Sequence, residues 1–360
     1  MGEKILVAMS GGVDSAVAAL LLKEEGYDIS AAYMKTWMNE EGIDVFGDCP
    51  WHEDIKSAQA VCDFLKIDFE VVDCIEEYRK QIVEYLVNGY KFGQTPNPDV
   101  MCNRKMKFGF FLDYALRNGF SKVATGHYAG IVDNPDNSRD IVCGEDPGKD
   151  QSYFLSMMTQ GQVQKAEMPI GGILKSQVRE IARLNGLPNA DKKDSQGICF
   201  LGKIKIQDFL KYHIKESAGN IVNADNKIVG RHTGLFKYTL GQRKGIGVPS
   251  NRDNKSYVVV AKDFDTNTLY VDFDDNLHSP LFVDEVFVEG INWINKPVEH
   301  ERQLQGRVRY RDEMVNINFI PLPNGRAKVQ FEQTQRALAA GQVLALYDNN
   351  VLLGGAFYSR

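Results

Sequence analysis

A chain of 360 residues, 43% of them hydrophobic and 25% charged, has the composition of a folded protein with more than one core, which excludes a disordered or fibrous chain. It contains no run of the roughly 18 to 20 apolar residues that span a bilayer, and its start lacks the apolar segment of a signal peptide, so we expect a cytoplasmic protein without membrane contact. The net charge of −6 argues weakly against a nucleic-acid partner, but phosphates respond to charges within about 10 Å rather than to the total.

The first 200 residues alternate short apolar runs with helical patterns, and this alternation predicts a parallel sheet flanked by helices. In chain order, strands are expected at residues 4–9, 29–34, 69–72 and 122–125. Helices are expected at residues 14–25, 53–66, 76–87, 104–117 and 175–185. We therefore predict an α/β domain over residues 1–205.

Beyond about residue 205 the pattern changes to short β-branched runs separated by turns rich in Asn, Asp and Gly. After a short helix at residues 206–214, strands are expected at residues 257–261, 268–273, 307–310, 315–319, 327–331 and 343–347. Such runs are typical of an antiparallel sandwich or barrel. A polar stretch at residues 274–280 divides them, so we predict a small, mainly-β central domain at residues 206–274 and a C-terminal β-barrel at residues 275–360.

The string Ser10-Gly11-Gly12-Val13-Asp14-Ser15 lies between the first predicted strand and the first predicted helix. Two glycines let the backbone approach an anion closely, and the helix that follows presents N–H groups and a partial positive charge. The serines add hydroxyl donors, and Asp14 can serve a magnesium ion. An ordinary glycine turn with a capped helix is the alternative. The whole string in this setting favours a phosphate-binding loop.

The loop is neither a Walker loop nor a dinucleotide-binding loop, because the spacings G-x-x-x-x-G-K-[ST] and G-x-G-x-x-G do not occur. Residues 144–149 (GEDPGK) imitate the first of these only superficially, since their spacing is too short. The Ser10–Ser15 string instead resembles the pyrophosphatase-type loop of enzymes that use ATP to adenylate a carbonyl oxygen. That superfamily contains small-molecule synthetases as well as tRNA-modifying enzymes.

Two of the six cysteines stand in polar, loop-like settings. Cys102 follows the proline-stiffened string Thr95-Pro96-Asn97-Pro98-Asp99 near the start of a helix, where a thiolate is stabilised. Cys199 lies in the glycine-containing string DSQGICFLG at residues 194–202. The alternative is that both are small buried hydrophobes, as we expect for Cys62 and Cys74 and more loosely for the two remaining cysteines, Cys49 and Cys143.

Six strings together resemble those of the bacterial tRNA 2-thiouridylase family, and they occur in that family's order along essentially the whole chain. They are SGGVDS, TPNPDVMCN, ATGHYA, GKDQSYFL, DSQGICFLG and YTLGQRKG. The resemblance implies an ATP-binding domain, a central domain that contacts tRNA and a C-terminal β-barrel. It implies 2-thiolation of the wobble uridine in the anticodon loop of tRNA, with adenylation by ATP and Mg²⁺ followed by sulfur transfer from a cysteine persulfide.

Site residues follow from the resemblance at matching positions. The ATP site is implied at Ala8, Met9, Ser10, Gly11, Gly12, Val13, Asp14, Ser15, Met34 and Gly126. Contacts to the target base or to tRNA are implied at Asn97, Pro98, Asp99, Lys149, Asp150, Gln151, Arg309 and Tyr310. Cys199 would carry the persulfide, Cys102 would help to release its sulfur, and Asp99 would act as general acid/base or orient the base. His127 remains open between a site residue and a packed histidine.

The reaction explains why these groups are needed. The C2 oxygen of uridine is a poor leaving group until adenylation makes it part of AMP, and loop N–H groups with Mg²⁺ neutralise the charge that develops on pyrophosphate. Attack by the second cysteine leaves a Cys102–Cys199 disulfide, which cellular thiols reduce. An iron–sulfur cluster held by Asp99, Cys102 and Cys199 is the alternative, although four-thiolate ligation would need more cysteines.

Residues 227–252 contain no acidic residue, which is unusual in a chain of net negative charge. The basic residues of this stretch are Lys227, Arg231, Lys237, Arg243, Lys244 and Arg252, and His232, Phe236 and Tyr238 lie among them. The stretch favours phosphate contact, with a solvated surface as the alternative.

Two other function classes remain open. A small-molecule adenylating synthetase would not need the two thiols, and a tRNA-binding module would not turn over ATP. The expected partners are tRNA and a cysteine desulfurase or sulfur-carrier protein as the sulfur donor.

Overall fold

The computed structural model describes residues 3–36, 51–193, 205–249, 255–273 and 279–359. Its N-terminal part is a parallel five-stranded sheet of order β3-β2-β1-β4-β7. The strands are β1 (Lys4–Ala8), β2 (Asp28–Lys35), β3 (Phe69–Asp73), β4 (Lys122–Ala124) and β7 (Ala166–Glu167). The α/β class predicted for this part is confirmed. Because the chain runs from β1 outward to β3 and then returns to β4 on the other side of β1, the order reverses between β1 and β4, where ligands of such sheets bind.

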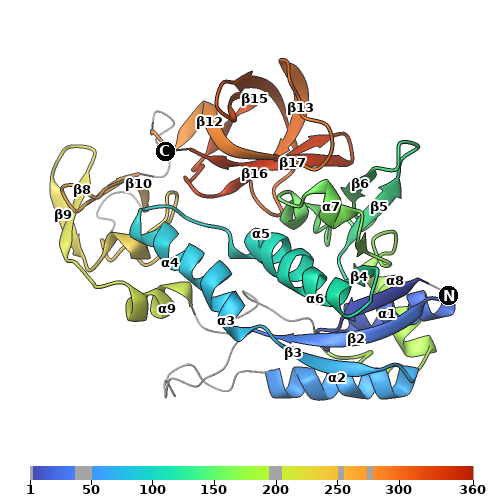
Figure 1. Ribbon diagram of the computed structural model, residues 1–360. Coiled ribbons are helices and arrows are strands. Elements are labelled where there is room, and N and C mark those ends of the chain that lie inside the picture. The colour runs from blue at the N-terminus through green and yellow to red at the C-terminus, as the bar shows by residue number, and fades with distance from the viewer. Residues whose placement is uncertain (1–2, 37–50, 194–204, 250–254, 274–278, 360) are drawn as a thin grey trace.

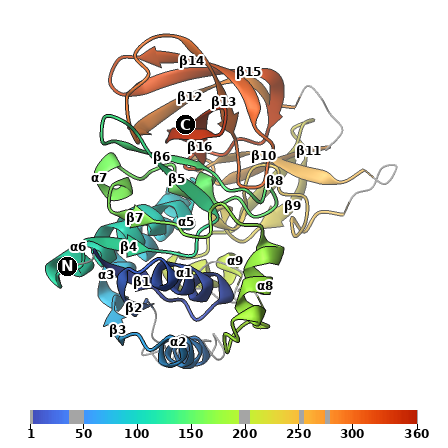
Figure 2. The same ribbon diagram turned by 90° about the vertical axis from the view of Figure 1, so that its right-hand side faces the viewer.

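Strand β1 is buried on both faces, and its alternate side chains enter two different cores. Ile5 and Val7 pack with α1 (Val13–Glu24), α2 (Trp51–Leu65) and α8 (Lys175–Leu184). Leu6 points to the opposite face and packs with the helices of residues 75–117. Figure 2 shows α1 and α8, which share the face of the sheet that carries Ile5 and Val7.

The helices of the second face are longer than the sequence predicts, and each contains π-helical turns. Residues 75–91 form α3 (Ile75–Tyr78), η2 (Arg79–Val83) and α4 (Glu84–Lys91). Residues 98–117 form α5 (Pro98–Met101), η3 (Cys102–Phe110) and α6 (Phe111–Arg117). A π-turn often marks a functional site, and η3 begins at Cys102 itself.

A closed barrel forms the C-terminal part, as predicted. Its strands are β12 (Phe282–Trp293), β13 (Arg302–Arg307), β14 (Val315–Leu322), β15 (Arg326–Arg336), β16 (Val343–Asp348) and β17 (Val351–Tyr358). β12 pairs with both β15 and β17, and this double pairing closes the barrel. Figure 1 shows the barrel lying over the helical layer of α4 and α5, where the Thr95 N–H donates to the Ala340 carbonyl at 2.8 Å.

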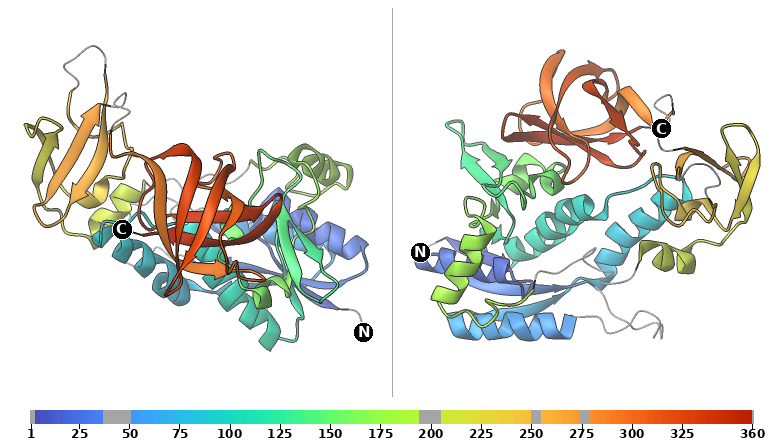
Figure 3. Two further views of the ribbon diagram at one scale, coloured as in Figure 1. Left: turned by 90° about the horizontal axis from the view of Figure 1, so that it is seen from above. Right: turned by 180° about the vertical axis from the view of Figure 1, so that it is seen from behind.

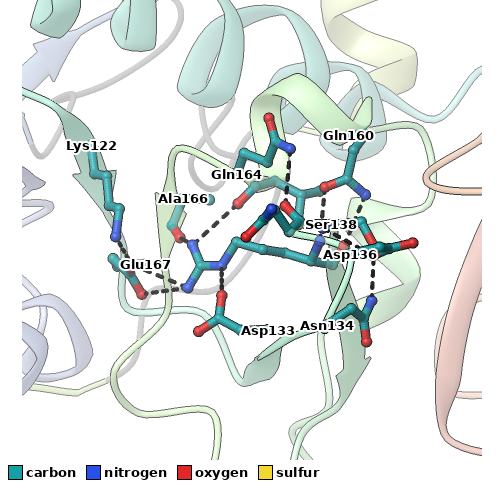
Figure 4. Close-up of polar contacts among 12 residues, drawn as sticks. Lys122, Asp133, Asn134, Asp136, Ser138, Gln160, Gln164, Ala166 and Glu167 are labelled. Carbon is teal, nitrogen blue, oxygen red and sulfur yellow. Dashed lines mark hydrogen bonds and ion pairs between the residues drawn. The ribbon is translucent and has the colours of Figure 1, made fainter.

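The sequence reading missed a hairpin that joins the α/β part to the barrel. Strands β5 (Ala129–Asp133) and β6 (Arg139–Cys143) follow β4, and β6 pairs with β17 through Ile141 and Val142. Arg139 fastens the hairpin to the parallel sheet, because its guanidinium bonds Asp133 at 2.7 Å, the Ala166 carbonyl at 2.8 Å and Glu167 at 3.2 Å. Figure 4 shows Glu167 also facing Lys122 of β4, at 2.8 Å. The hairpin therefore extends the sheet of the barrel, and the side chain of Arg139 ties it to the parallel sheet.

The central part is a small sheet with one helix. Its elements are α9 (Ile206–His213), β8 (Gly219–Asn223), β9 (Ile228–His232), η5 (Leu235–Lys237), β10 (Tyr257–Asp263) and β11 (Thr268–Phe273). The strand order is β10-β11-β8-β9, and β8 and β9 were not predicted. Phe209 of α9 and Phe236 of η5 join the core of the α/β part. Figure 3 shows this sheet beside the barrel.

Candidate active site

The loop between β1 and α1 has the geometry of an anion-binding loop. Gly11 has a φ of +76°, and a Cβ there would lie 2.3 Å from the Asp54 carbonyl oxygen, so only glycine fits. The Gly11 carbonyl accepts from Ser57 Oγ at 2.8 Å and from Asn189 Nδ2 at 3.1 Å. Gly12 caps α1 without a side chain, which leaves the first helical turn open to an anion.

The serines of the loop hold its shape. Ser15 Oγ donates to the Gly12 carbonyl at 3.0 Å and lies 3.1 Å from Ser10 Oγ. The Ser10 N–H donates to Ser15 Oγ at 3.2 Å. Ser15 is buried, and Ser10 is exposed at the mouth of the loop. The loop is therefore preformed, with Ser10 the hydroxyl that a ligand reaches first.

Asp14 is part of a small charged network. Lys175 Nζ, from the first residue of α8, lies 2.7 and 2.9 Å from the two carboxylate oxygens, and the Tyr128 hydroxyl donates to Oδ1 at 2.7 Å. The Lys175 side chain is only 12% exposed. If Asp14 is to bind magnesium, Lys175 must leave its ion pair with this carboxylate and pair with another anion. The phosphates of a bound nucleotide would be such an anion.

Residues 125–128, which follow β4, connect the phosphate loop with the helix that carries Cys102. A Cβ on Gly126 would lie 2.7 Å from both the Asp14 carbonyl carbon and the Ser15 nitrogen, so this segment touches the first turn of α1. His127 turns the other way, with Nε2 3.4 Å from Lys107 Nζ on η3. The segment lies at the point where the strand order reverses, between β1 and β4.

The string before Cys102 is a helix start. Asn97 caps α5, and its Oδ1 accepts from the N–H groups of Asp99 and Val100, both at 3.1 Å. Pro98 occupies the first helical turn, where its missing N–H costs nothing. The amide oxygen of Asn97 is thus engaged as a cap, so a contact between Asn97 and the target base would use its remaining polar atoms.

Cys102 lies inside a continuous helix rather than on a loop, and it is 4% exposed. Cys199 lies outside the described residues, so its placement relative to Cys102 stays a prediction. Cys62 and Cys74 agree with their predicted role as buried hydrophobes, because burial raises the pKa of each thiol to about 12. Cys143 is half-buried and its thiol pKa is also raised, mainly by burial.

The charge of Lys107 affects the pKa of both Asp99 and His127. Burial raises the pKa of Asp99, and the charge of Lys107 opposes that rise. Burial holds the pKa of His127 well below its usual value, with Lys107 adding to the effect. His127 is 6% exposed, and its Nδ1 lies 2.6 Å from Thr125 Oγ1. His127 is therefore a packed histidine, and a role for it in the reaction stays open.

Three family models match the chain in order. A tRNA methyl transferase HUP domain matches residues 3–203, a tRNA methyl transferase PRC-barrel domain matches residues 207–272, and an aminomethyltransferase beta-barrel domain matches residues 283–357. A protein of Akkermansia muciniphila named tRNA-specific 2-thiouridylase MnmA is 49% identical over 355 residues, which covers 99% of this chain and 98% of that protein. The chain belongs to the tRNA-specific 2-thiouridylase family.

Other relatives with that name are similar over the same length. The protein of Streptococcus thermophilus is 41% identical, covering 99% of this chain and 95% of its own. The protein of Pseudomonas paraeruginosa is also 41% identical, covering 98% of this chain and 93% of its own. The family resemblance predicted from the six strings is thereby confirmed. The domain boundaries predicted at residues 205 and 274 stay predictions.

The residues that the family resemblance assigns to tRNA contact lie where the α/β part meets the barrel. The Asp150 carboxylate is buried and bonded to Arg307, and Gln151 Oε1 accepts the Tyr128 N–H at 3.0 Å. Neither side chain points freely to solvent, and Lys149 is half-buried, so tRNA contact at this loop stays a prediction. On the barrel, the Tyr310 ring lies 4.2 Å from that of Phe154, whose carbonyl accepts from Asn103 Nδ2 of η3.

Arg309 is held against the barrel by its own neighbours. Its guanidinium bonds Asp312 at 3.0 Å and the Arg336 carbonyl at 2.8 Å. About a third of the side chain is exposed. It can therefore offer charge to a phosphate without leaving its position, although the contact itself stays a prediction.

The basic stretch of the central part divides into two groups. Lys227, Arg231, Arg243 and Lys244 are exposed, whereas Lys237 is bonded to Glu216 at 2.5 Å. His232, Phe236 and Tyr238 are buried. Tyr238 therefore packs in the core of the central part and Phe236 in the core of the α/β part. Arg252 lies outside the described residues.

Two lysines of the site, Lys107 and Lys175, were missed by the sequence reading. Lys175 carried a signal, because a lysine at the first residue of a helix opposes the helix dipole and calls for an anionic neighbour. Among the described residues, no three His, Cys, Asp or Glu side chains form a metal-binding group, and no helix is long and apolar enough to cross a membrane.

Proposed function

We propose that this protein converts the wobble uridine of tRNA to 2-thiouridine, with ATP as the activating substrate and a cysteine persulfide as the source of sulfur. Membership of a family named for tRNA 2-thiolation supports the overall reaction. The observation that carries the proposal is the segment of residues 125–128. It touches the phosphate loop through Gly126 and the helix of Cys102 through His127, so one short segment joins an activation site to a thiol.

The first step is adenylation of the uridine C2 oxygen. That oxygen attacks the α-phosphorus of ATP, a phosphorus–oxygen bond forms, and the bond to the β-phosphate breaks to release pyrophosphate. The N–H groups of Gly12 and the first turn of α1 stabilise the negative charge that develops on the leaving group. Lys175 adds a cation beside the same loop.

Magnesium would be held by the carboxylate of Asp14 together with phosphate oxygens and water, since Mg²⁺ takes oxygen ligands. When bound, the ion would neutralise charge on the leaving pyrophosphate. Asp14 fits this role by position, because it lies in the first turn of α1 beside the loop.

The second step transfers sulfur. The terminal sulfur of a Cys199 persulfide attacks C2, a carbon–sulfur bond forms and AMP leaves with the former C2 oxygen. The Cys102 thiolate then attacks Sγ of Cys199, which releases the thiocarbonyl sulfur to the base and leaves a Cys102–Cys199 disulfide. Two cellular thiol groups then reduce this disulfide, supplying two electrons and two protons, and become a disulfide themselves. Asp99, three residues before Cys102, acts as the general acid/base or orients the base.

The tRNA would be held by exposed cations and by the barrel. Arg231, Arg243 and Lys244 offer charge from the central part, and Arg309 does so from the barrel. The wobble base sits in a loop, so it can leave its stack at modest cost. The sulfur would come from a cysteine desulfurase or a sulfur-carrier protein.

Nucleoside mass spectrometry tests the proposal. Unmodified tRNA, ATP, Mg²⁺ and a persulfide donor incubated with the protein should give 2-thiouridine with one AMP per modified base. The family models that match the chain are described as methyl transferase domains. A mass increase that corresponds to an added methylene group, rather than to oxygen replaced by sulfur, would refute thiolation.

The remaining alternatives are distinguished by ATP turnover and by iron content. A small-molecule synthetase would keep its ATP turnover in a Cys102→Ser, Cys199→Ser double variant without tRNA. A tRNA-binding module would show no ATP turnover in the presence of tRNA. A cluster held by Asp99, Cys102 and Cys199 would appear as iron and colour in protein purified without oxygen.

A further inference from the structure

Three aromatic rings form a stack where the α/β part meets the barrel. Tyr153 of η4 (Ser152–Leu155) is buried, and its hydroxyl donates to the Val343 carbonyl of β16 at 2.8 Å. The Phe154 ring lies edge-on to the Tyr153 ring, with centroids 5.5 Å apart, and the Tyr310 ring lies 4.2 Å from the Phe154 ring. Rings at these separations attract each other, so the α/β part holds Tyr310 in place.

The outer end of this stack is the guanidinium group of Arg311. Its Cζ atom lies 5.4 Å from the centre of the Tyr310 ring, which is the arrangement of a cation–π contact. Arg311 is exposed, and its φ of +71° is in the left-handed region that residues other than glycine rarely adopt. Such a conformation costs free energy and is found often at binding sites. A role in binding would explain why the loop holds an arginine in this conformation.

The donors of Arg311 are unused, unlike those of the two arginines before it. Arg307 pairs with Asp150, and Arg309 pairs with Asp312. Within the described part of the chain, the side chain of Arg311 forms no ion pair and no hydrogen bond. The ring covers one face of the guanidinium group and leaves the five N–H groups, which lie in its plane, able to donate. Two such parallel N–H groups match two oxygens of a phosphate.

Arg311 lies between the site and the exposed cations of the central part. A Cβ on Gly241 would lie 3.6 Å from a guanidinium nitrogen of Arg336, so the central part touches the barrel here. Residues 243–244, which follow Gly241 closely, are exposed cations. The Arg336 carbonyl accepts from Arg309 at 2.8 Å, two residues before Arg311. The loop of Arg311 therefore continues the basic surface of the central part onto the barrel.

In the other direction, the stack of rings leads to Cys102. The Phe154 carbonyl accepts from Asn103 Nδ2 at 3.3 Å, and Asn103 directly follows Cys102 in η3. An RNA strand whose base reaches this helix has its backbone near the loop that carries Arg311. Glu313 of the same loop is exposed and carries the opposite charge. The loop therefore attracts phosphate at one side chain rather than as a whole.

We propose that Arg311 binds a phosphate group of the tRNA strand next to the target nucleotide, with its guanidinium group positioned by the ring of Tyr310. This inference rests on the proposed function for the identity of the RNA. The in-plane N–H groups of Arg311 donate to two phosphate oxygens. Arg309 stays bonded to the barrel and contributes only its charge.

The test is tRNA binding, measured by filter binding over a range of salt concentrations. Arg311→Gly is the main variant, because glycine adopts a φ of +71° without strain and the protein should keep its unfolding midpoint. Loss of the contact should weaken tRNA binding about tenfold or more at low salt and lower the salt slope by about 0.7 to 0.9. Arg311→Lys keeps the charge without the parallel donors, so it should keep most of the slope but bind more weakly.

Arg326→Ala is the matched control. Arg326 is exposed, and its guanidinium group lies 5.8 Å from the centre of the Phe287 ring, so it forms the same kind of contact. It pairs with Leu322 at the end of β14 opposite to the loop of Arg311, and its removal should change neither affinity nor slope. A double-mutant cycle of Tyr310→Leu and Arg311→Gly tests the positioning. The two losses should be less than additive, because each removes the same phosphate contact.

Normal affinity and a normal salt slope in Arg311→Gly overturn the inference, since the side chain is then merely solvated. Weaker binding with an unchanged slope overturns it as well, because no phosphate contact has been lost. Additive losses in the cycle refute the positioning by Tyr310. If the wild-type protein binds tRNA but forms no 2-thiouridine, the proposed function is wrong, and the salt slopes still decide whether Arg311 contacts phosphate. If the wild-type protein binds no tRNA, both proposals are wrong.

Discussion

The carboxylate of Asp150 lies 2.5 Å from the guanidinium of Arg307, and the two side chains are only 3% and 13% exposed. Asp150 belongs to the loop before η4, whereas Arg307 ends β13 of the barrel. The Asp150 Oδ1 atom also accepts the N–H groups of Gly144 and Ser152 at 2.9 and 3.0 Å. The buried Arg307 of the barrel is therefore paired with a carboxylate of the α/β part. Separation of the barrel from the α/β part would leave both charges unpaired.

Replacement of Arg307 by Met should destabilise the protein strongly. The substitution keeps much of the side-chain volume but leaves the Asp150 carboxylate buried without its partner, which typically costs about 3–5 kcal/mol. Chemical denaturation followed by circular dichroism measures the change. Arg302→Met on the same strand is the control, since its ion pair with Asp348 is about half exposed and should contribute at most about 1 kcal/mol. Equal small effects in both variants would contradict the buried pair's role.

Replacement of Gly126 by Ala should impair nucleotide binding. The new Cβ would lie 2.7 Å from backbone atoms of Asp14 and Ser15, and backbone cannot rotate away as a side chain can. Overpacking of about 1–3 kcal/mol would displace the phosphate loop and weaken ATP binding by about tenfold or more. Titration with a fluorescent ATP analogue measures this. Gly161→Ala on α7 (Gln160–Val163) is the control, because its Cβ would meet nothing within 4 Å.

Asp14→Ala should abolish thiolation at saturating ATP while it leaves tRNA affinity nearly unchanged. Asp14 lies in the first turn of α1, beside the loop where pyrophosphate must form, and its removal also leaves Lys175 without its carboxylate. The product is measured by nucleoside mass spectrometry and the affinity by filter binding. Asp28→Ala, at the opposite end of the sheet, removes an exposed carboxylate and should change neither. A near-normal yield from Asp14→Ala would show that the reaction does not require this carboxylate.

Arg243→Ala with Lys244→Ala should weaken tRNA binding and flatten its salt dependence. Each lost phosphate contact removes about 0.7 to 0.9 from the slope of log affinity against log salt, so the pair should remove up to about two units. Lys237 is left out of this variant, because it forms an ion pair with Glu216. Lys296→Ala, which changes an exposed lysine of the barrel, should leave the slope unchanged. If the double variant also leaves it unchanged, the stretch is a solvated surface.

Features that depend on local chain geometry could be predicted from the sequence. The Ser10–Ser15 loop was found because its glycines and the helix after it lie within six residues, and the α/β class followed from the alternation of apolar runs. The network around Asp14 could not be found in this way. Lys175 and Tyr128 reach that carboxylate from positions 161 and 114 residues away, and only the folded sheet brings them together.

Two other features could not be predicted from the sequence, for different reasons. The β5–β6 hairpin has short apolar runs around Asn134, and its partner strand β17 is more than 200 residues distant, so its pairing left no local signal. The aromatic residues Phe236 and Tyr238 stand among the basic residues of the central part in the sequence, and that position gives no sign that they are buried. Their burial is set by contacts with α9 and the central sheet, which a linear pattern does not contain.

The two cysteines should separate by role when the transferable sulfur is trapped. Sulfur exchange requires the two sulfur atoms to approach to about 2 Å, with Cα atoms within roughly 7 Å of each other. Cys199→Ser should accept no persulfide at the site and form no thiolated product. Cys102→Ser should still load sulfur on Cys199 but transfer it poorly, because no second thiol attacks Sγ of Cys199. Alkylation of the trapped persulfide followed by peptide mass spectrometry measures the loading.

The same experiment on the wild-type protein tests whether the two cysteines form a disulfide. After one turnover without reductant, peptide mapping should show a Cys102–Cys199 disulfide, since the released sulfur leaves both cysteines oxidised by two electrons. Cys62→Ser is the control, because that thiol is buried among α1 and α2 and its pKa is raised to about 12. A persulfide found on Cys102 and not on Cys199 would reverse the two roles. If neither cysteine carries a persulfide and the active protein contains iron, a mechanism that uses an iron–sulfur cluster is supported instead.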